Sequence, residues 1–148
     1  MKILVPVDGS KYSMEAVKVA SDFAKLKKAD ITVMTVTPFI PGVDLEISAK
    51  EMASLNESMK RRGEEVLEKA KVILTAEGIT FHTVLLSAVS PADEILGLAE
   101  KGKMDLIIIG HRGTGGDETR FFMGSVASKI AGHAPCSVYV VKTRLKTK

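Results

Sequence analysis

This chain of 148 residues has little of what several protein classes require. Its one cysteine, Cys136, leaves no disulfide to form within the chain, which excludes a disulfide-stabilised secreted scaffold. No apolar run approaches the roughly 18 residues that a membrane-spanning helix needs. The N-terminal apolar stretch is also too short for a secretory signal peptide, because the acidic Asp8 ends it. We therefore expect a cytoplasmic protein without membrane association.

Aromatic residues are scarce, with 5 Phe, 2 Tyr and no Trp. The formal net charge of +3 hints at a nucleic-acid partner, but three of the 21 basic residues lie in the last stretch, 143–148. Without them the basic residues equal the 18 acidic ones. A nucleic-acid-binding surface needs clustered basic residues, and aromatic residues where bases stack. We therefore predict no binding to nucleic acid.

Apolar runs alternate with helical patterns along the whole chain, 1–148, which we expect to form a single domain. The apolar runs predict strands over 3–7, 31–36, 80–86, 106–109 and 137–141. Helices are predicted to start at Ser10 or Ser13, to cover about 47–76, to run from Pro91 to Gly102, and to run from Gly124 to about 132–135. Such alternation predicts an α/β fold, an open parallel sheet with helices on both faces.

The densest functional signal is a glycine-rich segment, 110–116, with Gly124 and Ser125 further along. It lies between an apolar strand and a helix start, where backbone N–H groups and the helix dipole favour an anion. We interpret it as a phosphate cradle; the alternative is an ordinary strand-to-helix connection rich in glycine. The chain has neither a Walker A motif nor the dinucleotide-binding glycine spacing.

Asp8 follows the first predicted strand, and the glycine-rich segment follows the fourth. If these two strands are neighbours where the strand order reverses, Asp8 and the segment share one crevice. The polar residues there have competing interpretations. Asp8 can accept hydrogen bonds from a ribose or can cap the following helix; beside the glycine segment we favour ligand contact. Arg112 is a candidate phosphate ligand, whereas His111 and Arg120 are predicted to be solvent-exposed loop residues. With His82 in a strand and His133 at a helix end, no metal-ligand cluster or catalytic residue is predicted.

Four segments are informative in combination: 2–10, 105–113, 124–127 and 134–141. Together they resemble the universal stress protein family, in its ATP-binding branch, and the resemblance covers essentially the whole chain. It implies a Rossmann-like, adenine nucleotide alpha hydrolase-like fold with strand order 3-2-1-4-5. It also implies a regulatory, stress-response protein that binds ATP, with Mg²⁺ or Mn²⁺ only through the phosphates.

Carried over by position, the resemblance assigns ten residues to the nucleotide. Pro6, Val7 and Asp8 would hold adenine and ribose, and Val36 would wall the adenine. Ribose and phosphates would be surrounded by Gly110, Arg112, Gly113, Gly124, Ser125 and Val126. The family also implies a homodimer paired along the last strand, Val138–Val141, and an unknown protein partner.

Two departures from the family pattern stand out. Ten residues separate Gly113 from Gly124 where the family has nine, and Gly115 with Gly116 is the expected place for the extra residue. The stretch 88–91 lacks the family's glycine before Pro91, so no ligand contact is assigned there.

Two other functions remain open beside the regulatory ATP binder. One is a slow ATPase or phosphotransferase in which Asp8 and Ser125 help hold a metal bound to the phosphates. The other is a nucleotide-free dimerisation module that uses the long helix 47–76 as its interface. The loop 38–44 is a candidate lid.

Overall fold

The computed structural model of the chain describes residues 1–39, 47–113 and 123–144. Every predicted strand and helix is present there, although some boundaries differ by a few residues. The elements in chain order are β1 (Lys2–Pro6), α1 (Lys11–Lys27), β2 (Asp30–Pro38), α2 (Ala49–Ala76), β3 (Phe81–Ala88), α3 (Pro91–Lys101), β4 (Leu106–Gly110), α4 (Ser125–His133) and β5 (Ser137–Val141). The described residues do not include Gly115, Gly116, Arg120 or most of the candidate lid, 38–44.

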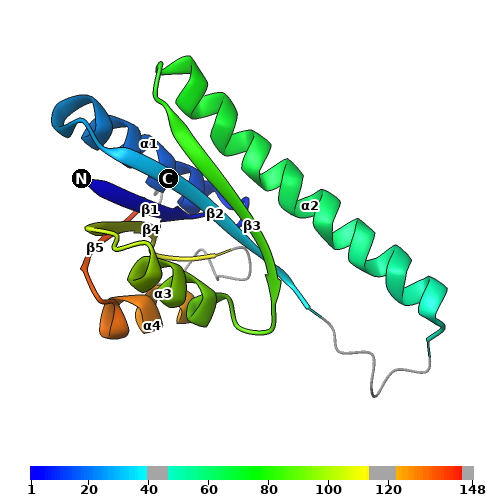
Figure 1. Ribbon diagram of the computed structural model, residues 1–148. Coiled ribbons are helices and arrows are strands. Elements are labelled where there is room, and N and C mark those ends of the chain that lie inside the picture. The colour runs from blue at the N-terminus through cyan, green and yellow to red at the C-terminus, as the bar shows by residue number, and fades with distance from the viewer. Residues whose placement is uncertain (40–46, 114–122, 145–148) are drawn as a thin grey trace.

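The five strands form one parallel sheet in the order β3-β2-β1-β4-β5, which confirms the predicted fold class and strand order. After β3 the chain crosses to the other side of β1, where β4 pairs with it in the register Ile3↔Leu106 and Leu4↔Ile107 (Figure 1). The strand order therefore reverses between β1 and β4. Open α/β sheets bind ligands at such a switch point, beyond the carboxyl ends of the strands.

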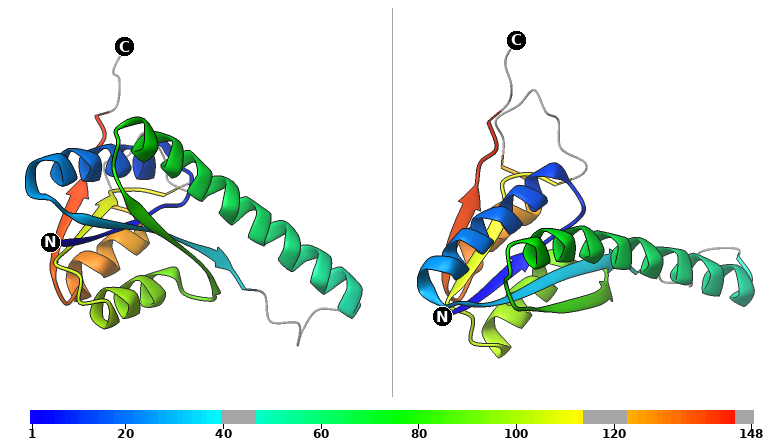
Figure 2. Two further views of the ribbon diagram at one scale, coloured as in Figure 1. Left: turned by 45° about the horizontal axis from the view of Figure 1, so that its top comes forward. Right: turned by 90° about the horizontal axis from the view of Figure 1, so that it is seen from above.

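Helices cover both faces of the sheet, as predicted (Figure 2). Side chains alternate along a strand, so Ile3 and Val5 pack with α1 and α2, whereas Leu4 packs with α3 and α4. All three are fully buried. Because both faces are covered, continuous apolar runs such as Ile107 to Ile109 are what these strands require.

The helix starts are fixed by hydroxyl side chains, except at α4. Ser10 is the N-cap of α1 and accepts a hydrogen bond from the Ser13 backbone N–H at 3.2 Å, so Ser10 and not Ser13 caps this helix. Ser90 caps α3 in the same way. The N-cap of α4 is Gly124, which has no side chain to occupy the first N–H groups. The first N–H groups of α4 thus receive no hydrogen bond from the N-cap side chain, unlike those of α1 and α3.

Candidate functional site

A cavity of about 420 Å³ lies beyond the carboxyl ends of β1 and β4. It brings together all ten residues that the sequence analysis assigned to a ligand: Pro6, Val7, Asp8, Val36, Gly110, Arg112, Gly113, Gly124, Ser125 and Val126. The volume falls in the range of about 300–1,000 Å³ typical of small-molecule sites. Segments from both halves of the sheet therefore form one site at the strand-order reversal.

The Asp8 carboxylate is positioned by the turn that joins β1 to α1. Its Oδ1 accepts a hydrogen bond from the Ser10 backbone N–H at 2.9 Å, and its own backbone N–H donates to Ser13 Oγ at 3.4 Å. Gly9 makes the turn possible with φ +87°, a left-handed value that other residues rarely adopt. Asp8 thus precedes the cap instead of being the cap, and its carboxylate borders the cavity.

Glycines let the β4 loop approach the β1 turn closely. A Cβ at Gly113 would lie 2.7 Å from Asp8 Oδ2, and a Cβ at Gly110 would lie 2.7 Å from the backbone oxygen of Tyr12 in α1. Both distances are shorter than any ordinary contact, so neither position accepts a larger residue without a local shift. At Gly110 the close atoms belong to the backbone, so packing requires glycine there, whereas at Gly113 the close atom is the end of the Asp8 side chain.

The two ends of the glycine-rich loop meet beside the start of α4. The Gly124 backbone N–H donates to the His111 backbone oxygen at 2.6 Å, and a Cβ at Gly124 would lie 3.4 Å from the Cα of Arg112. The ends of this loop are therefore held together, and they bring Gly113, Gly124 and Ser125 to one wall of the cavity.

His111 is buried, with 7% of its surface exposed, so the prediction of a solvent-exposed loop histidine was wrong. Its backbone N–H donates to the Val141 oxygen at 3.0 Å, and its ring lies edge-on to Tyr12 at 5.1 Å between centroids. Burial lowers the pKa of His111, a hydrogen bond to Val141 opposes this, and the charges of Arg112 and Lys142 lower it further. His111 thus ties the loop to β5 through its backbone N–H.

Arg112 and the N-terminus of α4 bring positive charge to the cavity lining. Arg112 is 6% exposed and lines the cavity together with Gly113 and Ser125. The N-terminus of α4 adds a partial positive charge of about one half. A guanidinium beside backbone N–H groups is a favourable environment for a phosphate.

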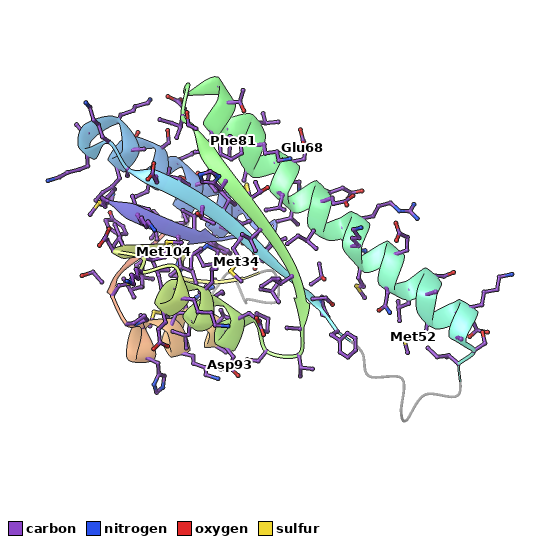
Figure 3. The ribbon with its side chains drawn as sticks, in the orientation of Figure 1. Met34, Met52, Glu68, Phe81, Asp93 and Met104 are labelled. Atoms are coloured by element: carbon purple, nitrogen blue, oxygen red, sulfur yellow. The ribbon has the colours of Figure 1, made fainter. Side chains whose placement is uncertain are left out.

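The cavity also has an apolar lining. Beside Val36 and Val7 it is lined by Met34 from β2, labelled in Figure 3, with Pro91 and Ile95 from α3 and Ile109 from β4. Met34 is fully buried and Ile95 is 3% exposed. The sequence analysis missed these residues, together with Ser13 and Ala127, and assigned no ligand contact near Pro91. The position of Ile95, one helical turn after Pro91, was the available signal.

The described residues contain no group of three or more His, Cys, Asp or Glu arranged to hold a metal ion. Among them, too, no helix is long and apolar enough to cross a membrane.

Comparison with known proteins decides the family. The sequence profile of the universal stress protein family matches residues 1–142. The chain belongs to the universal stress protein family. Universal stress protein MJ0531 of Methanocaldococcus jannaschii is 42% identical over 144 residues, which cover 95% of this chain and 81% of that protein.

Solved members of the universal stress protein family share the fold. The protein UspA from Lactobacillus plantarum is 23% identical with a TM-score of 0.80, and 97% of each chain is covered. The universal stress protein from Archaeoglobus fulgidus in complex with dAMP is 25% identical with a TM-score of 0.65, covering 96% of this chain and 98% of that one.

Proposed function

We propose that this universal stress protein binds an adenine nucleotide, ATP in particular, in the cavity between β1 and β4. The observation that carries the proposal is the lining of the cavity, which combines apolar side chains suited to a base with Arg112 and the N-terminus of α4, suited to phosphates. The complex of a relative with dAMP supports the same class of ligand.

Each part of the nucleotide would contact different residues of the cavity lining. Val36 and Met34 would pack on the adenine, and the Asp8 carboxylate would accept hydrogen bonds from the ribose. Arg112 and the loop ends Gly113, Gly124 and Ser125 would face the phosphates. Mg²⁺ or Mn²⁺ would arrive with the ATP phosphates, because such ions prefer oxygen donors.

We further propose that the protein is a cytoplasmic regulator that acts as a homodimer paired along β5. In the described part of the chain β5 pairs with β4 alone, which leaves its other edge open. The Val141 oxygen faces β4, since it accepts from His111, so the backbone groups of Val138 face the open edge. An apolar open edge favours pairing with a second copy.

Native mass spectrometry of the purified chain tests both proposals. We expect a dimer that carries ATP; a dimer with ADP would support hydrolysis, and a bare dimer that takes up no added adenine nucleotide would refute the binding proposal. Gly124→Leu should prevent uptake because it fills the phosphate end. Gly132→Leu on the same helix is the control, because no atom lies within 4 Å of an added Cβ there.

A further inference from the structure

Helix α2 is longer than the sheet that it covers. Its 28 residues extend about 42 Å. All of its buried residues lie in the second half, at Gly63, Leu67, Ala70 and Leu74. The first half, Ala49–Arg62, has no buried residue and runs past the ends of β2 and β3 in every view (Figures 1 and 2). This half of the helix therefore lacks a sheet beneath it.

The projecting half nevertheless keeps an apolar stripe. Met52, Leu55 and Met59 are half-buried, while the other residues from Ala49 to Arg62 are exposed. These three residues, the α2 stripe, are spaced by three and four and continue the line of Gly63 and Leu67 on the same helix face. Figure 3 shows Met52 near the free end of the helix, beyond the ends of the strands. The helix thus presents a core-like face where the sheet has ended.

Two residues of opposite charge lie along one side of the α2 stripe. Glu51 and Arg62 are both exposed and lie eleven residues apart, which is close to three full helical turns. They therefore lie on the same side of the stripe, about 16 Å apart along the helix. This side of the helix is acidic at one end and basic at the other. Its charges are therefore complementary to those of the same side of a second copy that runs antiparallel.

We propose that the α2 stripe binds the α2 stripe of a second copy in an antiparallel, two-fold arrangement. In this arrangement Glu51 faces Arg62 of the second copy, and the symmetry forms that pair twice. In a parallel two-fold arrangement this side would instead face the other side of the second helix, so Glu51 would not meet Arg62. The projecting half is about 21 Å long, so the contact is small and the association weak.

This contact is separate from the proposed pairing along β5. The sheet order puts β5 at one edge, and β3 at the other edge. The α2 stripe belongs to the helix that leads into β3. Copies that use both contacts would form assemblies larger than dimers. Nucleotide binding is not needed for this contact, so the proposal stands or fails independently of the cavity.

Charge reversal tests the proposal on exposed residues that should not disturb folding. The substitution Val138→Pro removes a backbone N–H at the open edge of β5 and so blocks pairing along β5. Association through α2 can then be measured alone. In this background, sedimentation velocity at low salt should show concentration-dependent dimers. Glu51→Arg or Arg62→Glu alone should weaken them about 5- to 30-fold, because two pairs become repulsive. An equimolar mixture of the two variants should restore dimers, since each carries the charge the other needs.

The controls separate this contact from a general charge effect. Glu57→Arg changes the opposite helix face and should leave the dimer unchanged, whereas Leu55→Glu should abolish it. A Val138→Pro chain that stays monomeric at high concentration would overturn the proposal. So would a mixture of the two charge variants that associates no better than either variant alone.

Discussion

The substitution Gly113→Ala adds one methyl group at the point where the two halves of the cavity meet. Its Cβ would lie 2.7 Å from Asp8 Oδ2. Among the described glycines, left-handed φ values occur at Gly9 and Gly78, so the Gly113 backbone accepts alanine without strain. The new methyl group therefore acts on the Asp8 carboxylate and not on the fold.

The size of the effect follows from how Asp8 is held. Restoring an ordinary contact requires Oδ2 to move by roughly 0.5–1 Å. Such a shift moves the carboxylate from the position in which its Oδ1 accepts from the Ser10 N–H at 2.9 Å. A displaced carboxylate loses a charge-assisted hydrogen bond to the ribose, which is worth about 1.5–3 kcal/mol. The expected loss of nucleotide affinity is about 10- to 100-fold.

Calorimetric titration with ATP measures this loss, and thermal unfolding checks that the variant is folded. Gly97→Ala in α3 is the matched control, because no atom lies within 4 Å of its added Cβ. It should keep wild-type affinity and gain about 0.5–1 kcal/mol of stability from the helix preference of alanine. Wild-type affinity in a folded Gly113→Ala variant would refute the role given to Asp8.

Three further predictions concern stability. Gly63→Ala should lower the free energy of unfolding in urea by about 1–3 kcal/mol, because its Cβ would lie 2.7 Å from Thr37 Cγ2 and 2.8 Å from Leu85 Cδ1; an unchanged midpoint would contradict this packing. Ser10→Ala should cost about 1 kcal/mol in the same assay through loss of the α1 cap. Burial lowers the pKa of His111 below that of the unfolded chain, so stability should fall as pH drops below about 6.5, and His111→Gln should remove that part of the dependence.

Much of the fold could be predicted from the pattern of apolar runs. Continuous runs such as Ile107 to Ile109 indicated strands covered on both faces, and glycine at 110 and 124 marked the loop between β4 and α4. Because carboxyl ends of parallel strands share one edge, Asp8 and the glycine-rich loop were expected in one crevice. The cavity contains both.

Other features depend on contacts that no local pattern contains. His111 looked like a loop residue because polar residues and glycines surround it in the sequence. It is buried because Tyr12 and Val141, distant in the chain, pack and bond against it. Similarly, Pro91 starts α3, and only the way that α3 lies across the sheet brings it to the cavity.

The length of α2 shows a third limit. The sequence predicted one long helix over about 47–76, and the helix is present. The sequence could not show where the sheet beneath it ends. That boundary depends on the lengths of β2 and β3, and it determines that the first half of the apolar face is left over.

A crystal structure of the chain grown with ATP tests the central claim most directly. We expect adenine beside Val36 and Met34, the ribose at Asp8, and phosphates at Gly113, Gly124 and Ser125. An empty cavity at saturating ATP, or ATP bound elsewhere on the chain, would contradict the claim that this cavity is the nucleotide site.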